Sequence, residues 1–295
     1  MRKVAKFAGI MLALAGTAAG MGLAATAMAK GTGAHAPYAT TKPAVKIDPA
    51  LLAVLADPRR DKDRARDIYR HPAETLAFFR IKPGMTVVDY LPSGGWFTRI
   101  LVPYLGDKGQ YIGLNPAEVN LTPERREILG DMADKFPAKA AEWTGVPASR
   151  ILAFNGDTIP AARKGTVDRA IIMREVHNIW PNGWLHPDLL AIRSLLKDDG
   201  LLGIEEHRAK PGAPFSETDS SKGYMREKDV IALVEANGFQ LVAKSEINAN
   251  PKDSANWPDG VWTLPPSYFL KDKDRAKYQA IGESDRMTLL FRKRP

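Results

Sequence analysis

Two histidines lie just past apolar runs of the chain, where the end of a strand would expose them. His177 follows the run 167–173, and His207 follows the run 201–205. Histidine can remove a proton near neutral pH, so each is a candidate general base, with His177 the first choice. Either can instead hold a loop by hydrogen bonds. With Glu175 and Glu206 they also suggest a metal site, but His-x-x-His and His-x-x-x-His spacings are absent, and we predict none.

The apolar runs alternate with helical patterns, which indicates βαβ units and a mostly parallel sheet. Ligands of such sheets bind at the carboxyl edge of the strands, where both histidines would lie. We expect helices at 96–105, 187–196 and 225–237, and one at 121–143 interrupted at Pro137. The expected strands are 85–90, 110–114, 150–154, 167–173, 201–205, 239–247 and 286–292. The last two flank a long irregular segment, 248–282, and suit an antiparallel hairpin at the sheet edge.

The run Lys82-Pro83-Gly84-Met85-Thr86-Val87-Val88-Asp89, followed by Pro92-Ser93-Gly94-Gly95, resembles the first strand and glycine-rich turn of class I S-adenosylmethionine-dependent methyltransferases. The stretch 90–98, with His177-Asn178, Glu206-His207-Arg208-Ala209 and Asp285-Arg286, is similar to a subgroup of exported bacterial predicted methyltransferases. The resemblance implies an α/β, Rossmann-like class I methyltransferase fold: a mostly parallel seven-stranded sheet with an antiparallel C-terminal hairpin. It also implies S-adenosylmethionine as cofactor.

Several residues match the cofactor-binding positions of that family one by one. The resemblance gives cofactor contacts to Asp89, Ser93, Gly94, Gly95, Asn115, Asp157 and Arg174. Asn115 stands where the family usually has an acid for the ribose hydroxyls, and Asp157 stands at the adenine position. Leu91 and Ser93 replace the first two glycines of the family turn. Each residue also has a simpler reading, since Asp89 can cap the next helix and the others can form turns.

Two classes of function follow from these patterns. The first is a methyltransferase acting on a small molecule or an envelope component. The second is a non-catalytic periplasmic ligand-binding module that retains the methyltransferase fold. Asp89, Gly95, Asp157 and the polar segments after the strands favour the first. The substituted glycines favour the second, as does export, because S-adenosylmethionine is made in the cytoplasm.

Composition excludes other classes of protein. The chain has 295 residues, of which 44% are hydrophobic and 26% charged, and it has no cysteine. The absence of cysteine rules out a disulfide scaffold, a cysteine-ligated zinc site and a thiol nucleophile. The formal charge of +8 is not gathered in a dense basic tract, so no nucleic-acid partner is expected.

The first 29 residues have the pattern of a secretory signal peptide. Residues 1–6 are positively charged, 7–28 are small and apolar, and Ala27-Met28-Ala29 offers a cleavage site. An uncleaved anchor helix is the rival interpretation. We predict cleavage after Ala29, a periplasmic or secreted product without a stable membrane anchor, a flexible leader over 30–57 and the methyltransferase-like domain over 58–295.

Overall fold

A computed structural model describes residues 46–129 and 131–295 of the chain. The predicted signal peptide, its cleavage site and most of the leader lie outside these residues. The sheet has the strand order β3-β2-β1-β4-β5-β7-β6. Six strands run in the same direction, and β7 runs opposite to them between β5 and β6. The predicted α/β, Rossmann-like fold is thereby confirmed. The strands are β1 Thr86–Tyr90, β2 Gln110–Asn115, β3 Ile151–Asn155, β4 Val167–Met173, β5 Leu196–His207, β6 Phe239–Ser245 and β7 Arg286–Lys293.

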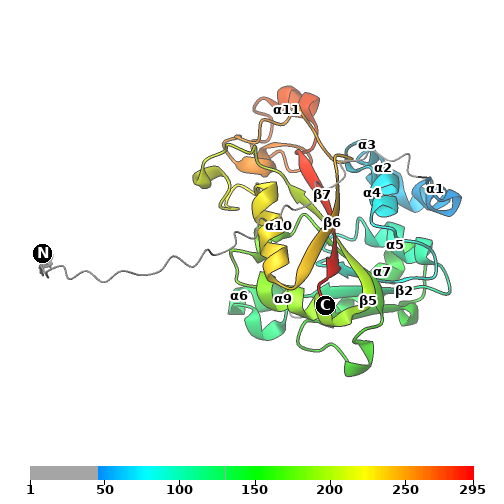
Figure 1. Cartoon of the computed structure of the whole chain (residues 1–295). Helices are drawn as coiled ribbons and strands as arrows, with labels where there is room; N and C mark the ends of the chain where they lie inside the picture. Colours follow the sequence, from blue (N-terminus) through cyan, green and yellow to red (C-terminus); the bar gives the residue numbers. More distant parts are fainter. Residues whose placement is uncertain (1–45, 130) are drawn as a thin grey trace, which may run out of the picture. The chain divides into compact units, whose positions relative to one another are not determined.

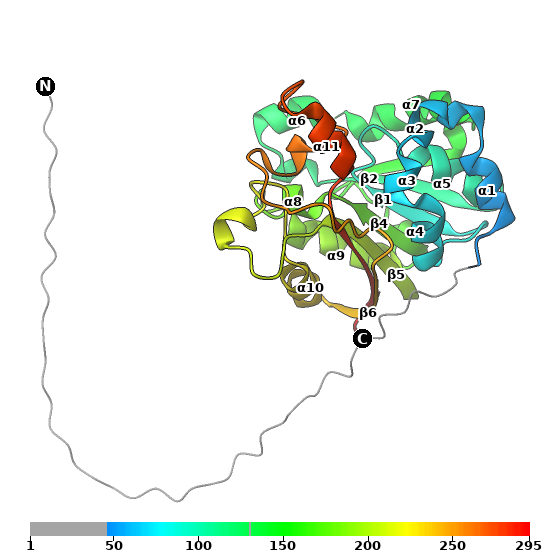
Figure 2. The same ribbon diagram turned by 90° about the horizontal axis from the view of Figure 1, so that it is seen from above.

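Helices cover both faces of the sheet (Figure 2). Alternate residues of β1 point to opposite sides, since Val87 joins one core cluster and Val88 the other. One face packs against α1 Pro49–Leu55, α4 Pro72–Phe78, α5 Thr98–Leu105 and α7 Met132–Thr144, and the other against α9 Leu185–Leu195 and α10 Glu227–Ala236. The shorter helices are α2 Asp61–Arg64, α3 Asp67–Arg70, α6 Pro123–Leu129, α8 Val176–Ile179 and α11 Arg275–Ile281 (Figure 1). Within residues 46–129 and 131–295, no helix is long and apolar enough to cross a membrane.

The folded part begins earlier than the predicted boundary at residue 58. Pro49–Leu55 form α1, with the Asp48 carboxylate accepting a hydrogen bond from the Ala50 amide as an N-cap. Leu51 is only 1% exposed and belongs to the core cluster of α4 and α5. The predicted leader is therefore wrong over its last residues, because the apolar side of this short helix is buried by distant elements.

The predicted helical break at Pro137 is also wrong. The helix α6 ends at Leu129, and α7 runs from Met132 through Pro137 to Thr144. A proline inside a helix costs about 3 kcal/mol, because it removes one backbone hydrogen bond and crowds the preceding turn. The neighbouring Phe136 and Ala140 are buried against the sheet. Burial of a phenylalanine side chain contributes about 1.5–3 kcal/mol, so tertiary packing offsets most of the local penalty.

The segment 248–282, predicted to be irregular, contains α11 and is anchored at its start. The Asp253 carboxylate is fully buried and accepts hydrogen bonds from the Tyr224 hydroxyl, the Trp257 indole and the Asp285 amide. These contacts attach the segment to the approach of β7. Its later residues therefore lie at the same sheet edge as the ends of β4 and β5.

Candidate functional site

The turn after β1 adopts a backbone conformation that glycine normally supplies. Leu91 and Ser93 both have a φ of 47°, and Gly95 has a φ of 71°. The Gly95 amide donates to the Pro92 carbonyl at 2.8 Å, and the Ser93 hydroxyl donates to the Leu91 carbonyl at 3.1 Å. Positive φ at two non-glycine residues costs of order 1–3 kcal/mol each. Such strain is typical of ligand-binding turns.

The two glycines of this turn have different surroundings. A Cβ at Gly95 would stand 2.1 Å from the Trp143 ring of α7, whereas a Cβ at Gly94 would meet nothing within 4 Å. Gly95 is buried and does not line the cavity beside the turn, whereas Ser93 and Gly94 do. The structure thus explains Gly95 by packing against α7 and leaves Gly94 open to a ligand.

Asp89 lies near the end of β1 and is 2% exposed. Its Oδ2 accepts a hydrogen bond from the Tyr111 hydroxyl at 2.8 Å and a longer one from the Thr98 hydroxyl at 3.5 Å. Burial raises the pKa of Asp89 to about 7, against the opposing effect of these hydrogen bonds. No side chain caps the backbone of α5, so Asp89 is not the helix cap that its sequence position allowed.

Asp89 lines a first cavity of about 240 Å³ between the turn and the segment that carries α2 and α3. The Trp96 indole lies in the same wall, is 8% exposed, and finds no acceptor for its Nε1 within the described part of the chain. The complete lining is Asp63, Arg66, Arg70, Asp89, Leu91, Pro92, Ser93, Gly94, Trp96, Phe97, Arg99, Met173, Arg174 and Glu175.

The two residues predicted to hold the nucleoside lie outside this lining. Asn115 pairs in register with Asn155 at the ends of β2 and β3, and both amide oxygens are buried without a hydrogen-bond donor among the residues described. Asp157 accepts from the backbone amides of Glu118 and Val119 at 3.1 and 3.2 Å. Asp157 therefore ties the loop after β2 to the loop after β3.

Arg174 follows β4 directly and has a φ of 60°. Its amide donates to the Glu205 carbonyl at 2.7 Å, and its Nη1 lies 3.0 Å from the Glu205 carboxylate. The next residue, Glu175, has its pKa raised by burial, despite a hydrogen bond from the Asn178 amide. Arg174 and Glu175 line the first cavity and also a second one.

The second cavity, of about 230 Å³, lies between the ends of β4 and β5 and the segment 261–267. It shares Arg66, Arg70, Met173, Arg174 and Glu175 with the first cavity, so one wall separates the two. The remaining lining residues are His177, Asn178, His207, Val261, Trp262, Pro265, Pro266, Ser267, Glu283 and Ser284. The structure thus brings both predicted histidines together with Arg174.

His177 forms a pair with Glu206, a residue whose role the sequence did not reveal. His177 Nδ1 lies 2.9 Å from Glu206 Oε1, and the His177 amide donates to Glu206 Oε2 at 3.1 Å. Burial lowers the pKa of His177, but the Glu206 carboxylate outweighs burial and leaves this pKa above its ordinary value. The sequence had offered Glu206 only as a candidate metal ligand and as part of the family-like stretch 206–209. The signal for a pairing was two consecutive acids, Glu205 and Glu206, after the apolar run 201–204, because buried carboxylates need partners.

His207 has the opposite electrostatics. Its Nδ1 lies 2.5 Å from the Ser284 hydroxyl, and its ring centroid lies 5.2 Å from that of His177. Burial, reinforced by nearby positive groups including Arg286, lowers the pKa of His207 well below its ordinary value. A neutral His207 is the weaker base of the two, which favours His177 for proton removal.

His177, Glu206 and His207 also form the one group of potential metal ligands found within the described residues, with ligand atoms within 4.8 Å of one another. Glu206 Oε1 accepts from both His177 Nδ1 and the His207 amide, the latter at 2.7 Å. These hydrogen bonds satisfy that oxygen without an ion. The arrangement is that of a carboxylate that orients an imidazole.

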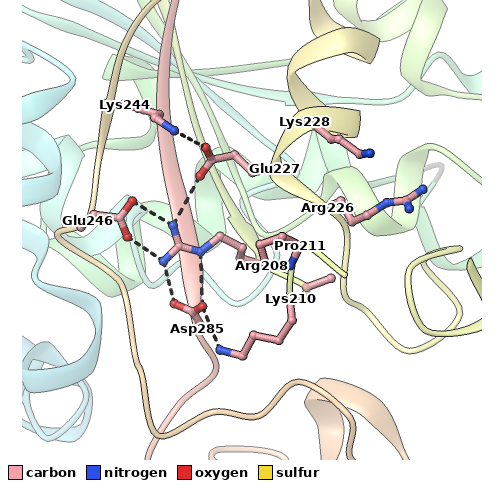
Figure 3. A pocket seen from close by; sticks show the side chains of 10 residues that line it. Arg208, Lys210, Pro211, Arg226, Glu227, Lys228, Lys244, Glu246 and Asp285 are labelled. Atoms are coloured by element: carbon pink, nitrogen blue, oxygen red, sulfur yellow. Dashed lines mark hydrogen bonds and ion pairs between the residues drawn. The ribbon is translucent and has the colours of Figure 1, made fainter. Parts of the chain in front are cut away.

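A third cavity, of about 470 Å³, lies beside β6 and β7 and is lined mainly by charged side chains (Figure 3). Arg208 lies in it and uses all three guanidinium nitrogens. Nε contacts Asp285 at 3.3 Å, Nη1 contacts Glu227 and Glu246 at 3.3 and 3.0 Å, and Nη2 contacts Glu246 and Asp285 at 2.7 and 3.0 Å. The protein itself occupies the donors of Arg208.

Comparisons with known proteins found similarity to solved structures alone. No family model matches the chain, and no curated protein matches it. A SAM-dependent methyltransferase from Aquifex aeolicus is 20% identical over 69% of this chain and 94% of its own, with a TM-score of 0.43. Geranyl diphosphate C-methyltransferase from Streptomyces coelicolor A3(2) is 14% identical over 84% and 89%, with a TM-score of 0.49. A putative sarcosine dimethylglycine methyltransferase from Galdieria sulphuraria is 14% identical over 79% and 86%, with a TM-score of 0.46. These likenesses concern the fold, which the strand order establishes independently.

Proposed function

We propose that this protein is an S-adenosylmethionine-dependent methyltransferase in which His177 is the general base. The observation that carries the proposal is a pair of cavities that share one wall at the carboxyl ends of β1 and β4. Asp89 and the strained turn line the first, and His177 lines the second. A transfer reaction needs this arrangement, because the group donor and the acceptor must meet while each is held by its own contacts.

The residues of the first cavity fit the cofactor in two respects. Gly94 leaves open space where a side chain would stand, so a ligand can approach the backbone. The Trp96 indole N–H offers a buried donor in the lining of this cavity. When bound, S-adenosylmethionine supplies a methyl group activated by a sulfonium.

The His177–Glu206 pair fits the removal of a proton from an acceptor. Because Nδ1 is held by Glu206, Nε2 is the nitrogen left to take the proton. The carboxylate fixes the ring orientation and favours its protonated form, which strengthens His177 as a base. General base catalysis of this kind typically contributes about 10²–10⁴-fold to a rate.

The proposal also covers the kind of methyl acceptor and the compartment in which the protein acts. A cavity of about 230 Å³ suits a small molecule or the exposed end of an envelope component. We further propose that the chain is exported and cleaved after Ala29, on the strength of the N-terminal pattern alone.

Calorimetric binding of S-adenosylhomocysteine to the purified protein tests the proposal. We expect micromolar affinity in the native protein and in Asp107→Asn, whose side chain is exposed, and a loss of at least tenfold in Asp89→Asn. Absence of binding to folded native protein would contradict the methyltransferase and leave a ligand-binding module with the same fold.

A further inference from the structure

Three arginines form the wall between the two cavities. Arg66 and Arg70 come from the region of α3, and Arg174 follows β4. Arg66 Nε contacts Glu283 at 2.7 Å, Arg70 Nε contacts Glu283 at 3.0 Å, and Arg174 Nη1 contacts Glu205 at 3.0 Å. Each guanidinium thus uses a single nitrogen for its contacts with the protein, although it carries five N–H donors.

The remaining nitrogens have no acceptor in the part of the chain that the structure describes. Arg70 is 6% exposed and stacks over Trp96, 4.8 Å from the ring centroid, yet neither Nη1 nor Nη2 has a hydrogen-bond partner there. Arg66 Nη2 is buried and likewise without a partner. Arg66 Nη2, as a buried donor of this strength, requires an acceptor, and the two cavities that Arg66 and Arg70 line are where one can bind.

The balance of charges in the wall also favours an anionic ligand. Glu283 is shared by Arg66, Arg70 and Arg286, and Glu205 is shared by Arg174 and Arg286, so four guanidinium groups contact two buried carboxylates. The other acid in the shared wall, Glu175, is bonded to the Asn178 amide, and burial favours its neutral form. Glu206 is paired with His177.

The two cavities differ in the acids that they add to this wall. The first adds Asp63 and Asp89, whereas the second adds only Glu283, which the arginines already hold. The second cavity also has Trp262, Pro265 and Pro266 in its lining, which gives an apolar surface beside the cations. An anionic group is therefore favoured on the second side of the wall.

On the basis of the proposed function, we infer that the second cavity binds an acceptor carrying a carboxylate or phosphate group, held by Arg66 and Arg70 with its nucleophilic atom toward His177. Guanidinium groups bind such oxyanions through paired hydrogen bonds. The acceptor is accordingly a small acid with a second, nucleophilic group and an apolar portion.

Calorimetry with 4-hydroxybenzoate and its uncharged analogue 4-hydroxybenzamide tests the inference. We expect the acid to bind about tenfold to a hundredfold more tightly, the loss typical of an unmade charge-assisted hydrogen bond. Arg70→Met should abolish the difference, and Arg70→Lys, which keeps the charge and supports folding, should reduce it. Arg292→Met is the matched control, because Arg292 is exposed and bonded to Gln240.

Three results would overturn the inference. The first is equal affinity for the two analogues, and the second is no binding of either analogue or of inorganic phosphate to folded protein. The third is a loss of S-adenosylhomocysteine affinity in Arg70→Met with unchanged affinity for 4-hydroxybenzoate and for 5′-methylthioadenosine, which lacks the carboxylate. That result would assign Arg70 to the carboxylate of the cofactor. Arg70-dependent binding of the acid without any binding of S-adenosylhomocysteine would support the oxyanion site and contradict the methyltransferase.

Discussion

Arg208, which is partly buried, and Arg70, which is buried, show two different uses of a guanidinium group. Arg208 contacts three carboxylates through all its nitrogens, in the largest of the three cavities (Figure 3). Arg70 contacts one carboxylate through one nitrogen, in two smaller cavities. By cavity size alone, the third cavity, around Arg208, would be the favoured ligand site. The hydrogen bonds favour the cavities around Arg70 instead, because a ligand is held by donors and acceptors that have no partner in the protein.

His177 should show the largest effect on activity. His177→Gln keeps an amide nitrogen near Glu206 but removes the base, so we expect turnover to fall about 10²–10⁴-fold with S-adenosylhomocysteine affinity unchanged. Single-turnover kinetics and calorimetry on the same preparations measure the two quantities. His186→Gln is the matched control, since His186 is exposed and bonded to Asn237. Equal turnover in the two variants would remove His177 from the chemistry.

Gly94 and Gly95 show the same contrast between a ligand-binding and a packing role at two adjacent backbone positions. Gly95→Ala would drive a Cβ into the Trp143 ring at positive φ, and we expect a destabilisation of about 2–4 kcal/mol. Gly94→Ala meets no atom within 4 Å, so its stability should change by less than about 0.5 kcal/mol while cofactor affinity falls. Chemical denaturation and calorimetry separate the two outcomes. Loss of stability in Gly94→Ala would show that both glycines serve packing.

The two arginines should separate stability from binding. Arg208→Met removes the shared partner of Asp285, Glu246 and Glu227, and because Arg208 is 17% exposed we expect a loss of about 1–3 kcal/mol. Arg70→Met should cost less, because Glu283 keeps Arg66 and Arg286. Guanidinium denaturation curves give both values. A larger loss for Arg70 would indicate that its role is structural.

Glu206→Gln should change the stability of the folded state with a distinctive pH dependence. Glu206 raises the pKa of His177, so this pair stabilises the folded state at pH below about 6.5, and the contribution disappears as pH rises through the higher folded pKa. Glu206→Gln should therefore cost about 1–2 kcal/mol more at pH 5.5 than at pH 8.5. It should also move the acid limb of the activity profile to lower pH. A destabilisation that is independent of pH would show that the charge of Glu206 does not act on His177.

Local patterns were sufficient for the sheet and for the position of the histidines. The strand β4 was predicted with the bounds that it has, because a continuous apolar run followed by polar residues depends on neighbours in sequence. The contacts between the arginines of the wall and their carboxylate partners were not predictable in this way. Arg70 and Glu283 are 213 residues apart, and nothing near either one indicates the contact.

The same limit applies to the turn and to the start of the fold. The sequence marked Gly95 as a ligand contact, but the need for glycine there comes from Trp143, which approaches from α7. Leu51 was predicted to lie in the leader, because the sequence near it does not show that α4 and α5 bury its side chain. Glu206 stood in the sequence as a candidate metal ligand and in the family-like stretch 206–209, but only the folded β5 places it against the helix of His177.

Binding of the cofactor in the first cavity, as proposed, can be followed directly through the Trp96 indole, which lies in the lining of that cavity. In protein labelled with ¹⁵N-tryptophan, the Trp96 Nε1–H resonance, assigned through Trp96→Phe, can be followed during titration with S-adenosylhomocysteine. Trp184 is the internal reference, because its indole already donates to the Asn120 carbonyl. We expect the Trp96 resonance to shift while that of Trp184 stays in place. An unchanged Trp96 resonance in folded protein at saturating ligand would contradict it.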